Sequence, residues 1–148
     1  MVWACMSAAG VGNLQFIETT MDKHVYLDIL MSNLMQSAEK LGIQDRFRFY
    51  QDNDPKHKSG IVQTWLIWNC PDVMQPPAQS PDLNVIENFW AILDTNIRKR
   101  KISCKADLKE ALIEEWAKIT PQITQKLVDS MPNRLKMVVD QKGGHTKY

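Results

Sequence analysis

The sequence has few cysteines, a low net charge and no long apolar run. The cysteines and the apolar runs each exclude a class of protein. Its 148 residues include three cysteines, Cys5, Cys70 and Cys104, which are far apart and in no metal-ligand spacing, so we expect reduced thiols in an intracellular protein rather than a disulfide scaffold. No apolar run approaches a membrane span, and the first residues lack the regions of a signal peptide. Length and composition fit one globular domain over residues 1–148.

The low net charge of +1 is a cancellation between segments. Residues 1–50 carry four basic and five acidic groups, residues 51–97 carry two and six, and residues 98–148 carry twelve and six. The acidic middle and basic end suit a cation site beside a polyanion site, although ordinary solvated faces explain the same distribution.

Hydrophobic periodicity and turn residues predict mostly helices with a few short strands. Two strands, 2–7 and 13–18, are expected to form a hairpin that turns at Gly10–Asn13. Asp22 and Gly42 fit the two ends of a helix over residues 23–41. The other expected elements are strands at 46–51 and 73–75, helices at 59–69, 84–97, 105–118, 121–129 and 131–139, and a loose tail at 140–148.

This order of elements is typical of an α/β fold with a mixed sheet. Ligands in such folds gather outside the carboxyl ends of strands, and Asp52 follows one such end. The tryptophans in helical patterns are expected in the core; they are Trp65, Trp68, Trp90 and Trp116.

Three carboxylates lie where a metal site would need them. Asp52 and Asp54 follow the predicted strand, and Glu87 falls in the first turn of the helix that begins at Asn84. Mg²⁺ is held by one or two carboxylates together with phosphate oxygens, so acids from different elements would have to converge. Local structure explains the same residues, because Asp52 to Pro55 fits an Asx turn and Asn84 with Glu87 fits a capping box.

Two further features have open interpretations. His57 can orient Asp52, hold a phosphate or be a structural histidine. The run Arg98, Lys99, Arg100 and Lys101 can contact DNA phosphates, act as a nuclear localisation signal or form a solvated helix end.

Several stretches together resemble one family. They are Gln51–His57 (Gln-Asp-Asn-Asp-Pro-Lys-His), Pro77–Asn84, Ile86–Trp90 and the ending Ser130–Tyr148. In this order they resemble the signature blocks of Tc/mariner superfamily transposases. The 34 residues between Asp52 and Glu87 match the aspartate–aspartate–34–glutamate pattern of the Tc-type branch. The resemblance covers essentially the whole chain.

The resemblance implies an RNase H-like catalytic domain of the DDE integrase and transposase type, with a mixed sheet flanked by helices and a helical C-terminal end. In this family two aspartates and a glutamate hold Mg²⁺ or Mn²⁺ for DNA cleavage and strand transfer. Asp52 corresponds to the second aspartate and Glu87 to the glutamate. Asp54, His57 and Asn84 match motif positions but not the catalytic acids. We therefore expect Asp52 and Glu87 to be catalytic and metal-binding, about 4–8 Å apart given the spacing of paired metal ions.

The family's first catalytic aspartate and its helix-turn-helix region lie upstream of the segment that this chain matches. The resemblance thus predicts an N-terminally truncated domain that is weak or inactive as a nuclease by itself. It implies DNA as a partner, a homodimer or a full-length transposase as an assembly, and the nucleus as the location. His57 and the run Arg98 to Lys101 are the expected DNA contacts.

Two other hypotheses remain open. The basic last third suits a non-catalytic nucleic-acid-binding or interaction module derived from a transposon relic, whose affinity would fall steeply with salt. A chain that lacks a central strand would leave a sheet edge unpaired and fold poorly.

Overall fold

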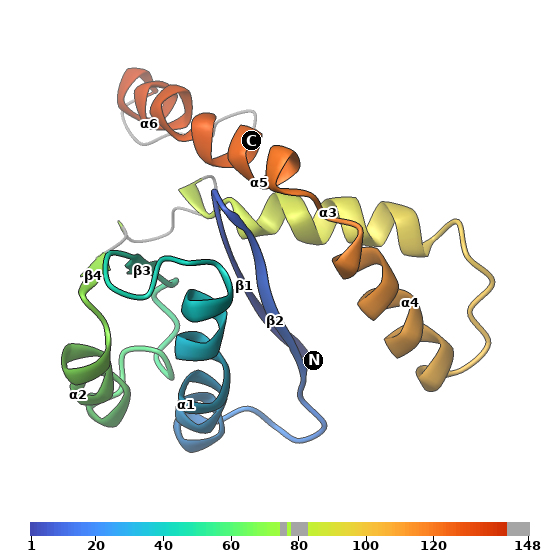
Figure 1. Ribbon diagram of the computed structural model, residues 1–148, viewed down its shortest axis with the longest axis horizontal. Coiled ribbons are helices and arrows are strands. Elements are labelled where there is room, and N and C mark those ends of the chain that lie inside the picture. Colours follow the sequence, from blue (N-terminus) through green and yellow to red (C-terminus); the bar gives the residue numbers. More distant parts are fainter. Residues whose placement is uncertain (75–76, 78–82, 142–148) are drawn as a thin grey trace. The chain divides into compact units, whose positions relative to one another are not determined.

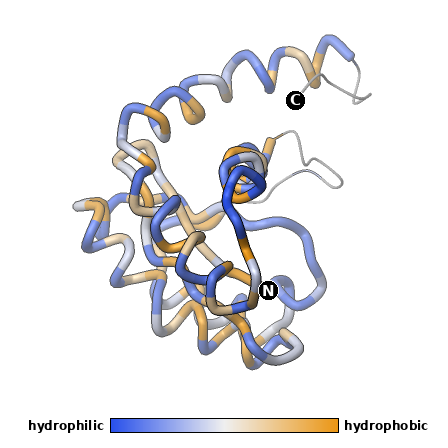
Figure 2. The backbone as a smooth tube through the Cα atoms, turned by 90° about the vertical axis from the view of Figure 1, so that its right-hand side faces the viewer, coloured by the Kyte–Doolittle hydropathy of each residue, from blue (hydrophilic) through white to orange (hydrophobic). Residues whose placement is uncertain are grey.

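The computed structural model describes residues 1–74, 77 and 83–141 (Figure 1). Its strands are β1 (Val2–Ser7), β2 (Gly10–Phe16), β3 (Arg48–Tyr50) and β4 (Asp72–Met74). Its helices are α1 (Lys23–Lys40), α2 (Gly60–Asn69), α3 (Ile86–Ile97), α4 (Lys105–Ala117), α5 (Pro121–Asp129) and α6 (Met131–Asp140). Figure 2 shows hydrophobic and hydrophilic residues interleaved along the chain, and none of the described helices is long and apolar enough to span a membrane.

The chain divides into two compact units. The first contains Met1–Cys5 and Gly12–Pro81, and the second contains Met6–Val11 and Asp82–Tyr148. Each unit is described by itself below.

β1 and β2 form a hairpin with a tighter turn than predicted. At its base, the Ile17 amide donates to the Met1 carbonyl oxygen at 2.9 Å, and the Met1 amino group donates to the Ile17 carbonyl oxygen at 3.3 Å. The turn occupies residues 8–9, and β2 starts at Gly10, whose φ of 140° is open to glycine. The expected turn at residues 10–13 is therefore wrong, because those residues already belong to β2.

Gly12 has a packing role in place of the predicted turn role. A Cβ on this residue would lie 2.5 Å from Sγ of Cys5 and 2.7 Å from Cβ of Ser37 on α1. The amide of the next residue, Asn13, donates to Oγ of Ser37 at 2.9 Å. The missing side chain at Gly12 thus lets β2 lie directly against α1.

α1 begins and ends as predicted. Oδ1 of Asp22 accepts hydrogen bonds from the amides of His24 and Val25 at 2.8 and 2.9 Å, which caps the helix. Gly42 follows the C-terminal end with a φ of 66°, the left-handed conformation that ends many helices. The buried face of α1 supplies half of the core of the first unit, through Tyr26, Leu30, Leu34 and Ala38.

β3 and β4 are parallel neighbours, with Phe49 opposite Val73, and α2 lies between them in sequence. Val62 and Leu66 of α2 pack into the same core as α1. Because these two residues occupy its buried face, Trp68 is 81% exposed and the expectation of a core position is wrong. The described strands form two two-stranded sheets, one a hairpin and one parallel, and Asp52 follows the carboxyl end of β3.

The second unit contains α3 to α6, which lie where helices are predicted, together with the turn end of the hairpin. Phe89 of α3 and Trp116 of α4 are buried and meet edge to face, with 6.2 Å between ring centroids, and Trp90 stacks on Trp116 at 6.0 Å. Thr124 of α5 is fully buried, and its Oγ1 donates to the carbonyl oxygen of Ala8 at 3.0 Å. α6 ends at Asp140, and residues 142–148 of the predicted tail lie outside the described residues.

Candidate catalytic and metal-binding site

Asp52 lies in the turn that follows β3, with its side chain 59% exposed. Its Oδ1 accepts a hydrogen bond from the amide of Asp54 at 3.1 Å, which confirms the predicted Asx turn. The same Oδ1 lies 2.6 Å from Nδ1 of His57. Within the described part of the chain, Oδ2 of Asp52 has no hydrogen-bond partner. One oxygen of this carboxylate is therefore fixed and the other is open.

His57 is held by contacts with α1, with α2 and with the turn that follows β3. Its side chain is 14% exposed, and its ring stacks on Tyr26 of α1 with 3.9 Å between centroids and 29° between planes. Its carbonyl oxygen accepts hydrogen bonds from Nε2 of Gln63 at 2.8 Å and Nε2 of Gln51 at 3.3 Å. The hydroxyl of Tyr26 donates to Oε1 of Gln51 at 2.7 Å. Motif spacing gave no indication of Tyr26 or Gln63, whose contribution depends on tertiary contacts.

Asp54 is used within the turn. Its Oδ1 accepts from the amide of Lys56 at 2.8 Å, and its Oδ2 lies 2.9 Å from Nζ of the same lysine. Burial raises the pKa of Asp54, but the hydrogen bonds from the Lys56 amide and ammonium outweigh it, so the pKa falls below its ordinary value. Both oxygens of Asp54 are thus engaged by Lys56 within the turn.

The negative charge of Asp52 affects the pKa of two nearby tyrosines. Burial, and then the nearby negative charge of Asp52, raise the pKa of Tyr26 and that of Tyr50 above the ordinary value. Both hydroxyls therefore stay protonated across the physiological pH range, and Tyr26 remains a hydrogen-bond donor.

Glu87 lies in the first turn of α3 and is exposed. The predicted capping box does not form: the N-cap residue is Val85, without a side-chain cap bond. The carbonyl oxygen of Asn84, and not its side chain, accepts from the amide of Glu87 at 3.1 Å, and Nδ2 of Asn84 lies 3.5 Å from Oε1 of Glu87. The carboxylate of Glu87 is therefore not consumed by the helix terminus, and most of its acceptor capacity is open.

Asp52 and Glu87 belong to different units, so their separation stays a prediction. The described residues contain no group of three or more His, Cys, Asp or Glu side chains placed to hold a metal ion. Each of the two acids nevertheless offers an exposed carboxylate oxygen, the donor that hard cations prefer. Taken separately, Asp52 and Glu87 each supply the oxygen donors that Mg²⁺ and Mn²⁺ accept.

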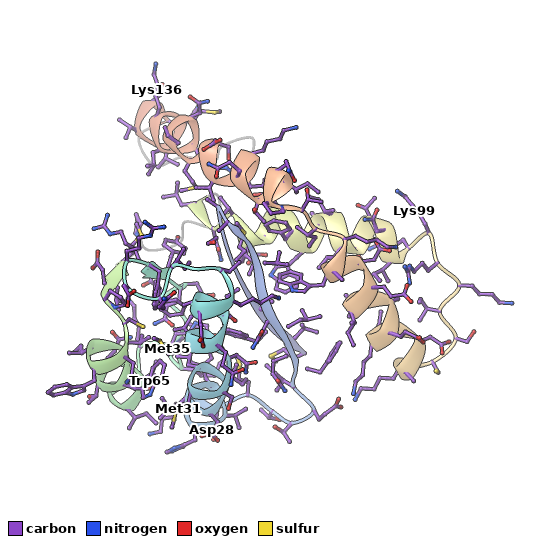
Figure 3. The ribbon with its side chains drawn as sticks, viewed as in Figure 1. Asp28, Met31, Met35, Trp65, Lys99 and Lys136 are labelled. Carbon is purple, nitrogen blue, oxygen red and sulfur yellow. The ribbon has the colours of Figure 1, made fainter. Side chains whose placement is uncertain are left out.

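The basic run at the end of α3 is divided between bound and open cations. Arg98 pairs with Asp94 at 2.7 Å, an i,i+4 spacing that is visible in the sequence. Among the described residues, the Lys99 side chain contacts only Oδ1 of Asn96, at 3.5 Å, and Figure 3 shows it extending away from the ribbon. Lys101 is exposed.

Arg100 forms ion pairs with two glutamates. It lies 2.7 Å from Glu114 and 2.6 Å from Glu115 of α4. The hydrogen bond from Lys118, and after it that from Arg100, hold the pKa of Glu115 below its ordinary value despite opposing desolvation. Both arginines of the basic run are thus paired within the chain, and among the described residues Lys99 and Lys101 are the cations of the run without an ion pair.

The chain is similar in sequence to known proteins. The family model of the DDE superfamily endonucleases matches residues 2–109. Over its full length the chain is 42% identical to the Tcb1 transposase of Caenorhabditis briggsae and 37% identical to the Tc1 transposase of Caenorhabditis elegans. It covers 54% of each, so the chain spans about half the length of these curated relatives.

Solved structures share the fold. The Mos1 transposase catalytic domain, solved with raltegravir and Mn, gives a TM-score of 0.85 at 18% identity over 99% of this chain and 82% of that one. A pre-cleavage Mos1 transpososome gives 0.84 at 20% identity over 95% of this chain and 43% of that one. These likenesses confirm the expected RNase H-like fold class. The chain therefore belongs to the DDE superfamily endonucleases, in the Tc/mariner transposase branch.

Proposed function

We propose that this chain carries the Asp52–Glu87 part of a transposase active site, which cleaves and joins DNA phosphodiesters with a divalent cation. The observation that carries the proposal is Asp52 itself: it follows the carboxyl end of β3 with one oxygen fixed and the other open. Glu87 adds an exposed carboxylate, which Nδ2 of Asn84 approaches at 3.5 Å.

The proposed cation is Mg²⁺ or Mn²⁺, held by Asp52 and Glu87. Support comes from the oxygen donors of these residues and from Mos1 catalytic-domain structures solved with Mn and with Mg. When bound, such a cation stabilises charge on the phosphoryl group and lowers the pKa of bound water. Asp52 and Glu87 hold and orient it, while the His57 and Asp54 contacts keep Asp52 in place.

The proposed substrate and partner is DNA. Relatives were solved as a Mos1 paired-end complex with a left transposon end and as a strand transfer complex. In this chain Lys99 and Lys101 are the open cations of the basic run, and we assign the phosphate contacts to them in preference to Arg98 and Arg100. The location proposed for such a protein is the nucleus, with a second copy or a full-length transposase completing the assembly.

Metal binding by the purified chain tests the catalytic proposal directly. Mn²⁺ titration followed by electron paramagnetic resonance should show a site that Asp52→Ala and Glu87→Ala each weaken about tenfold or more. The matched control is Asp28→Ala, which removes an exposed acid from α1 and should leave the affinity unchanged (Figure 3). A chain that binds no Mn²⁺, or whose Mn²⁺ site survives Asp52→Ala, would contradict the proposal.

A non-catalytic nucleic-acid-binding module is the second candidate. The observation in its favour is the excess of twelve basic over six acidic groups in residues 98–148. This candidate predicts DNA binding that persists in EDTA and is unaffected by Asp52→Ala. Plasmid nicking that requires Mn²⁺ and is lost in Asp52→Ala would decide for the catalytic function.

A further inference from the structure

The contact between His57 and Asp52 indicates which ring nitrogen of His57 carries the hydrogen. Nδ1 of His57 lies 2.6 Å from Oδ1 of Asp52, and since a carboxylate only accepts, Nδ1 carries the hydrogen and donates it. The other ring nitrogen, Nε2, is buried without a hydrogen-bond partner among the described residues. A neutral ring with its hydrogen on Nδ1 leaves a lone pair at Nε2 and avoids a buried unpaired N–H. Both nitrogens therefore favour the same tautomer.

The imidazole is held so that this donor points in one direction. The Tyr26 ring covers one face at 3.9 Å, and the Gln63 amide anchors the His57 carbonyl oxygen at 2.8 Å. The Tyr26 hydroxyl in turn holds Gln51, the residue next to Asp52. Asp52 has no such packing, because its side chain is 59% exposed. The histidine is therefore the packed member of the pair, and the acid is the exposed member.

Resting on the proposed function, we propose that His57 is a positioning residue: it fixes Oδ1 of Asp52 and leaves Oδ2 to bind the divalent cation. His57 itself contacts neither cation nor DNA in this role. Hydrogen-bonded partners behind a metal ligand typically change metal affinity 10–100-fold, so the contribution is large enough to measure. This role replaces the DNA contact expected for His57, whose ring is too buried and too engaged to serve a phosphate.

Two substitutions separate positioning from packing. His57→Phe keeps an aromatic ring on Tyr26 and removes the donor, whereas His57→Asn keeps a donor near the Nδ1 position and removes the ring. If His57 positions Asp52, Mn²⁺ affinity falls about tenfold or more in His57→Phe and stays close to wild type in His57→Asn. Thermal melting should show the opposite order, because His57→Phe retains the stack and no longer buries an unpaired nitrogen. Affinities that follow the melting temperatures would overturn the proposal in favour of a structural role.

The tautomer provides a readout that needs no metal. Long-range ¹H–¹⁵N spectra of the metal-free chain should show His57 with its hydrogen on Nδ1, and Asp52→Ala should weaken this preference because it removes one of its two causes. A wild-type ring with its hydrogen on Nε2 would refute the positioning role even if the chain binds Mn²⁺ as the proposed function requires. Absence of Mn²⁺ binding with the Nδ1 tautomer present would instead refute the proposed function, and the metal role of His57 with it.

DNA binding in EDTA completes the comparison. His57→Phe should bind DNA as the wild type does, since the proposal gives the ring no contact with phosphate. A loss of DNA affinity in His57→Phe without a loss of Mn²⁺ affinity would restore the DNA-contact role and overturn positioning.

Discussion

The hydroxyl of Tyr26 donates to Oε1 of Gln51 across 2.7 Å and so ties α1 to the residue that precedes Asp52. The ring of the same tyrosine is 2% exposed and carries the stack with His57. One side chain thus supports the turn at two points. Its packing and its hydrogen bond can be separated by mutation.

Removing only the hydroxyl should weaken the fold modestly. Tyr26→Phe keeps the stack with His57 but leaves Oε1 of Gln51 without its donor, so the free energy of unfolding should fall by about 1 kcal/mol. Urea denaturation measures the change. Tyr50→Phe is the matched control, because its hydroxyl has no hydrogen-bond partner in the described part of the chain, and it should change stability by less than about 0.5 kcal/mol. Equal losses in the two variants would show that the Tyr26–Gln51 bond is not stabilising.

Substitution by alanine should be tolerated at Gly60 but should destabilise the protein at Gly12. In Gly12→Ala the Cβ would lie 2.5 Å from Sγ of Cys5 and 2.7 Å from Cβ of Ser37, so β2 and α1 would have to separate. We expect a loss of about 1–3 kcal/mol of unfolding free energy. Gly60→Ala meets nothing within 4 Å and lies at the start of α2, where alanine should be neutral or stabilising by a few tenths of a kcal/mol. Thermal melts of the two variants compare them directly, and similar melting temperatures would contradict the steric argument.

The sequence predicts best the local features that short-range hydrogen bonds determine, such as helix caps and turns. The Asp22 cap and the Asp52–Asp54 turn join residues two or three positions apart, and both form as expected. The hairpin turn was misplaced because two glycines near a turn do not reveal which one is needed for turning and which for packing. Gly12 is explained by Ser37, a residue that no local pattern connects to it.

The sequence indicates the two acids of the proposed site but not the residues that support one of them. Motif spacing identifies Asp52 and Glu87, but the Tyr26–Gln51 bond spans 25 positions and the Arg100–Glu114 pair spans 14, so neither follows from spacing. Trp68 is a similar case. The helical pattern predicts a core position for it but cannot show which face of α2 packs against the core. Tertiary packing decides these cases.

The turn around Asp54 should lose stability in acid. The Lys56 amide and ammonium outweigh burial and lower the pKa of Asp54 below its ordinary value of 3.8, so the ionised form favours the folded state. This stabilisation is complete above the ordinary pKa and disappears as the pH falls through the lowered one. Asp54→Asn should therefore cost about 0.5 kcal/mol at neutral pH, since the ion pair is partly exposed, and nothing in strong acid. Denaturation of both proteins across this pH range tests it, and a difference that grew toward low pH would contradict the assignment.

The division of the basic run between lysines and arginines makes a quantitative prediction for DNA. Each phosphate contact contributes about one unit to the slope of log affinity against log salt concentration, so Lys99→Ala with Lys101→Ala should reduce the slope by about two. Arg98→Ala should leave it nearly unchanged, because that guanidinium already pairs with Asp94. Fluorescence anisotropy with a labelled duplex over a series of salt concentrations gives the slopes. A larger effect for Arg98→Ala than for the lysine pair would mean that the ion pair with Asp94 opens on DNA and that the arginine is the true contact.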